Sequence, residues 1–440
     1  MTPAQLGTCF FLQMFAIIAT SKVVGWLAKR FLGQPQVVGE MIAGVVLGPS
    51  LFGLFAPHLQ EALFPKASIS VLYVGAQFGV GLYMFLVGLG FRTDHFRSNG
   101  RSAVTVSLSG MAAPFALALL IAPWLLGQGL FGKGVDTFQA TLFTGAAIAI
   151  TAFPMLARII HERGLSDLPM GTLSLTAGAV DDAGAWIVFA IVLASFGGGP
   201  MVAVKAIAGA AAFAVFMVAL GPRLLAPLGR LAEREGRVSP GLLAIVLMLF
   251  FLCAFAMDGI GIHAVFGGFL LGAVMPRGLL SKDLRRQLEP FATVVLLPMF
   301  FTFSGLSTRL GMVDNLAMVL ATVAILGASI IGKGGACWAA ARLSGQDNPT
   351  ALGIAALMNS RGLMELIIIN LGLQRGIIQP ALFSMLVLMA IVTTLMASPL
   401  FELAYGRKAR ERGELGALNE AQPEAPLIAA VAGQNAGAAL

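Results

Sequence analysis

DLPMGTLSLTAGAVDDAGAWIVFAIVLASF, residues 167–196, is an apolar stretch with two adjacent carboxylates, Asp181 and Asp182, at its middle. A helix needs roughly 20 apolar residues to cross a hydrocarbon layer about 30 Å thick, and this stretch is long enough. An ionised group at the centre of a bilayer costs at least about 2.5–3.5 kcal/mol, so such groups are kept mainly where they bind something. The stretch therefore predicts a transmembrane helix with an ion-binding or proton-binding function.

The whole chain has the composition of an all-α polytopic membrane protein. Of its 440 residues, 58% are hydrophobic and 11% are charged, whereas soluble domains carry about 25% charged residues. Apolar runs recur along nearly the whole length, and we predict about thirteen transmembrane helices. Their expected spans are 8–28, 35–54, 69–91, 102–127, 138–160, 167–196, 201–222, 239–257, 259–276, 287–307, 315–342, 349–373 and 377–404.

Basic residues are distributed by loop, and this predicts the orientation. The net charge of +7 does not indicate nucleic-acid binding, because these residues form no single patch. They collect in alternate loops, as the positive-inside rule describes. We expect an integral protein of the bacterial plasma (inner) membrane, with the N-terminus outside, the C-terminus in the cytoplasm and the first apolar run retained as a helix.

The number of expected spans suggests how the chain is organised. We expect a transmembrane domain over residues 1–405 and a cytoplasmic tail over 406–440, which is mostly disordered because it has no sustained apolar period. Thirteen spans divide into six, one and six, with the seventh as a connector. The two halves would then insert with opposite topology, as inverted repeats do in many secondary transporters.

Two expected helices are interrupted near mid-membrane. The fifth is broken at Ile150-Thr151-Ala152-Phe153-Pro154, and the twelfth, its counterpart, at Met358-Asn359-Ser360-Arg361-Gly362. Proline removes a backbone donor, and unwound backbone at this depth is tolerated only inside protein or along a wet cavity. The breaks predict crossed half-helices around a site, with ordinary kinks as the alternative.

The adjacent acids can serve two roles. Neighbours on a helix point about 100° apart, so one can face a cavity while the other faces a packed helix. A carboxylate in a cavity can hold a proton or a small hard cation, which couples the movements of the two. Lys333, near the middle of the eleventh span, needs a nearby carboxylate, and Asp181 or Asp182 is the candidate.

Other polar residues are further candidates. Arg361 and Glu365 are four residues apart, which permits a local ion pair that braces the second break or regulates the site. Asn359, Glu40 and His263 are additional candidates for a role in transport.

Other functional classes have little support in the sequence. Residues 327–334 nearly match a phosphate-binding loop, but Gly334 stands where Ser or Thr is required. Cys9, Cys253 and Cys337 have no metal-ligand spacing and are expected to be reduced. We expect neither a cofactor nor an enzyme. The alternatives are a cation channel and an intramembrane aspartyl hydrolase. The hydrolase would need two acids that meet at one site, whereas adjacent acids on one helix point in different directions.

Seven ordered blocks between about residues 8 and 404 resemble the monovalent cation:proton antiporter-2 family. They are Gln34-Pro35-Gln36-Val37-Val38-Gly39-Glu40 with Gly44, Leu47-Gly48-Pro49-Ser50 and Phe85-Leu86-Val87-Gly88-Leu89; Thr151-Ala152-Phe153-Pro154-Met155-Leu156-Ala157-Arg158; Asp181-Asp182 with Ala185-Trp186; Gly261-Ile262-His263-Ala264; Leu297-Pro298-Met299-Phe300-Phe301; Gly332-Lys333; and Asn359-Ser360-Arg361-Gly362-Leu363-Met364-Glu365-Leu366.

The resemblance implies a sodium/proton-antiporter fold that acts as a homodimer. Spans 1–3 and 8–10 would form the dimerisation domain, spans 4–6 and 11–13 the mobile core, and span 7 the linker. Asp182 would carry the metal ion (Na+, Li+ or K+) or protons, Asp181 would pair with Lys333, and Thr151 would lie beside the ion. Relatives with Asn or Gln in place of Asp181 are linked to electroneutral or K+ exchange, so the resemblance favours electrogenic Na+/H+ exchange, with K+/H+ exchange as the alternative.

Overall fold

The computed structural model describes residues 2–32, 34, 36–90, 96–162, 165, 168–196, 200–260, 264–312 and 315–411. Within them the chain is helical, as predicted, and its only β-pairing is an isolated bridge between Phe131 and Ile378. The α-helices are α1 (Pro3–Leu32), α2 (Gln36–Leu47), α3 (Phe52–Phe55), α4 (Pro57–Leu63), α5 (Lys66–Gly90), α6 (Phe96–Gly127), α7 (Thr137–Ala149), α8 (Phe153–Glu162), α9 (Pro169–Ser195), α10 (Pro200–Glu235), α11 (Pro240–Ile260), α12 (Ala264–Val274), α13 (Leu279–Phe291), α14 (Leu297–Leu306), α15 (Leu316–Gly327), α16 (Gly335–Leu343), α17 (Asn348–Met358), α18 (Leu363–Gln374), α19 (Pro380–Phe401) and α20 (Arg407–Glu411).

Wide π-helical turns join several of these helices into longer rods. One such turn, Ala292–Leu296, connects α13 to α14, another, Ala328–Gly334, connects α15 to α16, and a third, Glu402–Gly406, connects α19 to α20. A π-turn inserts an extra residue into the helical ladder and often marks a functional site. The second turn carries Lys333, at the middle of the span in which the sequence predicted it.

Nine helical segments within the described residues are long and apolar enough to cross a membrane. They are Pro3–Leu32, Gln36–Phe55, Lys66–Gly90, Arg101–Gly127, Ala208–Glu235, Pro240–Ile260, Leu279–Leu306, Leu316–Leu343 and Pro380–Gly406, with shorter apolar helices at Ala264–Val274, Asn348–Met358 and Glu365–Gln374. The chain is therefore a polytopic membrane protein, and the count of thirteen crossings stays a prediction.

Several helices extend beyond their predicted ends, and α10 does so by the most residues. α10 continues past residue 222 to Glu235, and its added turns bury Leu225 and Ala232. α10 packs against α13. The tail, expected to be without structure from residue 406, instead begins with α20, where Lys408 pairs with Asp347 at the start of α17. The remainder of the predicted tail, residues 412–440, lies outside the described part of the chain.

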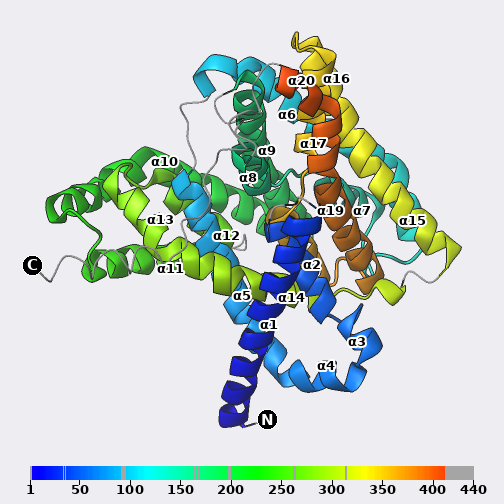
Figure 1. The fold of residues 1–440 in the computed structure, drawn as a ribbon, viewed down its shortest axis with the longest axis horizontal. Coiled ribbons are helices and arrows are strands. Elements are labelled where there is room, and N and C mark those ends of the chain that lie inside the picture. The colour runs from blue at the N-terminus through cyan, green and yellow to red at the C-terminus, as the bar shows by residue number, and fades with distance from the viewer. Residues whose placement is uncertain are drawn as a thin grey trace, which may run out of the picture.

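Close helix packing depends on glycines, which are enriched where membrane helices meet. In Figure 1, α10, α11 and α13 lie on one side of the molecule and α15 and α16 on the other, with α1, α2 and α14 between them. A Cβ on Gly305 would lie 2.0 Å from the Gly44 carbonyl oxygen, and one on Gly272 would lie 2.1 Å from that of Phe85. The pairs α2–α14 and α5–α12 are therefore in backbone contact.

Gly305→Ala is expected to separate α2 from α14 and to destabilise the protein by about 1–3 kcal/mol, the usual cost of overpacking. The measurement is denaturant or thermal unfolding in detergent. Gly241→Ala is the matched control, since a Cβ there meets nothing within 4 Å. Equal stability of the two variants would contradict the backbone contact.

Candidate functional site

Both predicted helix breaks are present. α7 ends at Ala149, and the backbone of Ile150 is extended (φ −76°, ψ 132°) before α8 begins at Phe153. α17 ends at Met358, and α18 begins at Leu363. At the breaks, the ends of these four helices leave backbone N–H and C=O groups without partners in their own helix, so each break requires hydrogen-bond partners from elsewhere in the fold.

The two breaks satisfy one another. The Ala152 amide donates to the Ser360 carbonyl (3.0 Å), and the Thr151 hydroxyl donates to the Met358 carbonyl (2.7 Å). Gly362 permits this approach because a Cβ there would lie 2.9 Å from Met155 and 3.0 Å from Ala152. Segments more than 200 residues apart in the chain therefore form one unit at the centre of the fold.

Asp181 is tied to this unit by two donors on the same oxygen. Its Oδ2 accepts from Lys333 Nζ (3.0 Å) and from the Thr151 amide (2.7 Å), and the side chains of Asp181 and Lys333 are fully buried. Lys333 also donates to the Ala149 carbonyl at the end of α7. The structure thus brings together the two residues that the sequence suggested as a pair, and it adds the backbone of the first break to them.

Asp182 lies in the same helix with a different environment. It is 0% exposed, and neither of its carboxyl oxygens has a hydrogen-bond partner among the described residues. A buried carboxylate without partners is costly, because the full desolvation penalty is not offset. This carboxyl group can be stable when it holds a proton or when a cation accompanies it.

Arg361 makes the contacts that the sequence did not reveal. Its Nη1 donates to the carbonyls of Ala147 (3.1 Å) and Ile150 (2.9 Å), and its Nη2 donates to the Ile148 carbonyl and to Ser329 Oγ (2.5 Å). Carbonyl ends of helices carry partial negative charge, so the guanidinium neutralises the end of α7. Backbone acceptors leave no signal in a sequence. Ser329 could have been noticed, because it lies four residues before Lys333 and therefore on the same side of that helix.

The expected pair of Arg361 and Glu365 is long. Arg361 Nε lies 3.7 Å from Glu365 Oε2, beyond hydrogen-bond distance, and both side chains are fully buried. Neither carboxyl oxygen of Glu365 has a hydrogen-bond partner among the residues that are described. Thr394 of α19 also braces the second break, because its hydroxyl accepts from the Arg361 amide (3.0 Å).

The remaining candidates lie at different places. Asn359 is buried in the second break, and its Nδ2 is 3.4 Å from the Ile330 carbonyl, in the π-turn that carries Lys333. Glu40 lies away from the breaks, where it pairs with Lys22 (3.8 Å) and accepts from Gln36 (3.0 Å). His263 lies outside the described residues. All three cysteines are free thiols, as predicted.

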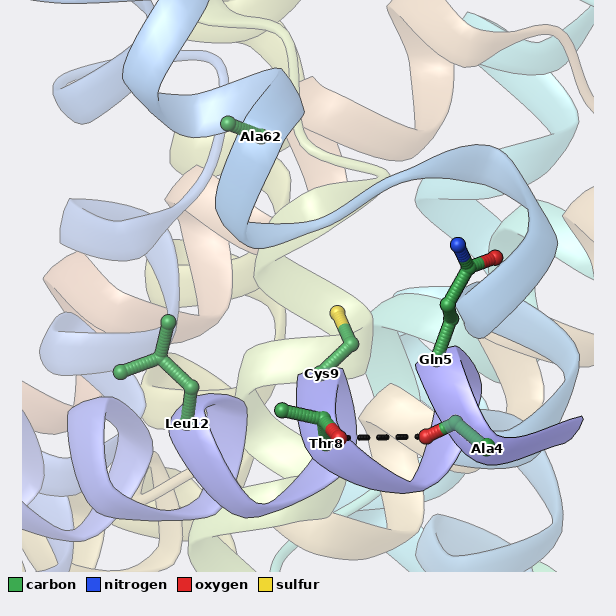
Figure 2. Close-up of a pocket in the computed structure, with 6 residues that line it drawn as sticks. All are labelled: Ala4, Gln5, Thr8, Cys9, Leu12 and Ala62. Carbon is green, nitrogen blue, oxygen red and sulfur yellow. Dashed lines mark hydrogen bonds between the residues drawn. The ribbon is translucent and has the colours of Figure 1, made fainter. Parts of the chain in front are cut away.

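A pocket at the N-terminal end of α1 is separate from these residues. Figure 2 shows its lining of α1 side chains and Ala62 of α4, with Thr8 donating to the Ala4 carbonyl (3.1 Å). The lining is uncharged and includes none of the break residues. The charged groups in the centre of the fold therefore remain the candidate site.

Arg361→Met is expected to destabilise the protein by about 3–5 kcal/mol, since it leaves Glu365 without its cation and the end of α7 without its donors. Adding Glu365→Gln should recover part of this loss, because it removes the unpaired charge. Unfolding in detergent measures both effects. Arg309→Met, at an exposed position, should stay within about 0.5 kcal/mol of the parent protein. No recovery in the double variant would refute the buried ion pair.

Comparisons with known proteins show the family of the chain. The transmembrane sodium/hydrogen exchanger family matches residues 18–403. The chain is 38% identical to the Na(+)/H(+) antiporter NhaS4 of Synechocystis over 89% of its own length and 96% of that protein. It is 32% identical to Cation/H(+) antiporter 18 of Arabidopsis thaliana and 31% identical to K(+)/H(+) antiporter 1 of Saccharomyces cerevisiae. These matches cover 92% and 90% of the chain, but only 50% and 46% of the plant and yeast proteins.

Proposed function

The chain belongs to the sodium/hydrogen exchanger family, and we propose that it exchanges a monovalent cation, Na+ in the first place, for protons across a membrane. The relatives are antiporters, so the protein is a transporter and not an enzyme. The transported ion is the substrate of this process and requires no resident cofactor.

The observation that carries the proposal is the contrast between Asp181 and Asp182. Asp181 is committed to Lys333 and to the Thr151 amide, whereas Asp182 is buried with both oxygens free of protein donors in the described part of the chain. A carboxyl group in this condition exchanges a proton for a cation and cannot hold both. Asp182 is the carrier in this proposal, and the Thr151 hydroxyl oxygen would lie beside the ion.

Na+ is preferred to K+ in the proposal for two reasons. The relative matched over 96% of its own length is named a Na(+)/H(+) antiporter, whereas the K(+)/H(+) relative from yeast is matched over about half of its length. Asp181 is an acid, as the family resemblance implies for electrogenic sodium exchangers. K+/H+ exchange is the alternative, and cation flux that is independent of pH would instead indicate a channel.

The Asp181–Lys333 pair offers a second proton. If the pair opens when Asp182 takes up a cation, Lys333 can release its proton, and two protons then exchange for one cation. One net charge would cross the membrane per cycle, worth roughly 2.3 kcal/mol per 100 mV. The membrane voltage would then contribute to the extrusion of Na+.

Thirteen crossings follow if the broken and joined helices are counted as spans. In chain order these are α1, α2, α5, α6, α7–α8, α9, α10, α11, α12, α13–α14, α15–α16, α17–α18 and α19. We propose that α6–α9 and α15–α19 form a moving core, that α1, α2, α5 and α11–α14 form the dimerisation domain, and that α10 links them.

Helix contacts support inverted repeats. If spans 1–6 correspond to spans 8–13, the contact of α2 with α14 corresponds to that of α12 with α5, and both contacts are extensive. Contacts within each half also correspond. The contact of α1 with α2 corresponds to that of α11 with α12, the contact of α6 with α9 to that of α15 with α19, and the contact of α8 with α9 to that of α18 with α19. A pseudo-two-fold relation between the halves accounts for this pattern, because the same pairs recur with their order exchanged.

The homodimer and the orientation remain parts of the proposal. Large apolar side chains are exposed on α1 and α11, among them Phe11, Phe15 and Phe255, as expected of surfaces that face lipid or a second copy. The distribution of Lys and Arg among the loops supports an outer N-terminus and a cytoplasmic C-terminus.

Asp182→Asn is expected to abolish cation-dependent proton flux in proteoliposomes, because an amide can neither release a proton nor supply a charge to the cation. Flux is measured with a pH-sensitive dye as Na+, Li+ and K+ are added in turn. Asp258→Asn, an acid at an exposed position of α11, should leave the coupling intact. Coupled flux that survives Asp182→Asn would remove Asp182 from the carrier role.

Lys333→Ala combined with Asp181→Asn is expected to retain exchange but to lose its dependence on voltage, since one proton would then replace one cation. The test compares proton flux at zero voltage and at an imposed potential of about 100 mV. A double variant as sensitive to voltage as the parent protein would exclude Lys333 as the source of the second proton.

A further inference from the structure

Among the described residues, two hydrogen bonds join the proposed core to the proposed dimerisation domain, and a third joins the core to the segment that follows α14. Gln34 Nε2 donates to the Leu395 carbonyl of α19 (3.0 Å), and Asn370 Nδ2 of α18 donates to Ser304 Oγ of α14 (3.1 Å). The Arg309 amide, after α14, donates to Ser384 Oγ of α19 (2.8 Å). We call these the interdomain bonds, and the side chains that make them are buried.

Local chemistry explains why α19 has acceptors to offer. In a regular helix the Leu395 carbonyl would accept from the amide of residue 399, but that residue is Pro399, which has no N–H. Gln34 supplies the missing donor. At the other end of α19, the Ser384 hydroxyl donates to the Pro380 carbonyl (2.9 Å), which leaves its oxygen free to accept from Arg309.

The two bonds on α19 hold it at widely separated points. Leu395 and Ser384 are eleven residues apart in sequence, about 16 Å along the helix axis at 1.5 Å per residue. Both partners lie in the segments that flank α2 and α14, which are themselves in backbone contact. A displacement of α19 along α2 and α14 by one helical turn would separate each donor from its acceptor.

We propose that Gln34, Ser304 and Ser384 are positioning residues that set the equilibrium between the two orientations of the core. This inference rests on the proposed function, in which the core moves to present Asp182 to each side. The interdomain bonds stabilise the arrangement in which they form and are absent after the core moves. Their number and strength therefore determine which orientation is more populated.

The chain offers matched controls. Thr393 lies on α19, like Ser384, but within the described part of the chain its hydroxyl bonds only to the Met389 and Ala390 carbonyls of its own helix. Thr308 follows α14 and bonds to the Ser304 carbonyl. Thr393→Val and Thr308→Val remove a buried hydroxyl without removing an interdomain bond.

The experiment measures the separation of the two domains by electron spin resonance. Spin labels are attached at Leu252→Cys on α11 and Leu343→Cys on α16, which are 61% and 88% exposed, after the three native cysteines are replaced by alanine. Ser304→Ala and Ser384→Ala should each lower the ratio of the described arrangement to the other by about fivefold, the effect of one neutral hydrogen bond.

Transport kinetics provide a second readout. Apparent KM for Na+ on each side varies inversely with the fraction of protein open to that side, so the ratio of the two KM values should change by the same factor of about five. A merely structural defect would reduce the amount of active protein and leave this ratio unchanged. Right-side-out and inside-out vesicles give the two values.

Distance distributions and KM ratios that are the same in Ser304→Ala, Ser384→Ala and the two threonine controls would overturn the inference. The spin-label measurement does not depend on transport. If the parent protein shows no cation-dependent proton flux, the proposed function fails, and the spin-label distances still test the interdomain bonds. The two failures are therefore distinguishable.

Discussion

Two cationic side chains hold the carbonyl end of α7, and the close approach of the two broken helices depends on them. Lys333 bonds to the Ala149 carbonyl, and Arg361 bonds to the carbonyls of three neighbouring residues. A helix that ends inside a membrane leaves acceptors that no water can satisfy, so the fold must supply donors there. Both donors come from the second half of the chain, and this requirement joins the two halves.

The same arrangement leaves one acid in excess. Within the described centre of the fold, the fully buried ionisable groups tied to the breaks are three acids, Asp181, Asp182 and Glu365, and two bases, Lys333 and Arg361. Asp181 is bonded to Lys333, and Glu365 faces Arg361, although at a longer distance. The charge of Asp182 is therefore the one that a proton or a metal ion has to neutralise, and the proposed exchange is a consequence of this balance.

The sequence predicted the parts of the site that depend on residue type and could not predict those that depend on backbone. The positions of both breaks follow from proline and other poor helix formers, and the need of Lys333 for a carboxylate follows from the cost of an unpaired buried charge. The role of Arg361 could not be predicted in this way, because its acceptors are mostly backbone carbonyls, which every residue has. No sequence pattern indicated α20, which is held by bonds from Lys408 to Asp347 and Thr350 at the start of α17.

Competition between a proton and a cation for one carboxyl group is the central claim, and proton release upon cation binding tests it most directly. Purified protein in a weakly buffered detergent solution is titrated with Na+ while the pH is recorded, and calorimetry in buffers of different ionisation enthalpy counts the protons released. The account predicts at least one proton released for each Na+ bound and none in Asp182→Asn. Na+ that binds without releasing protons would contradict it.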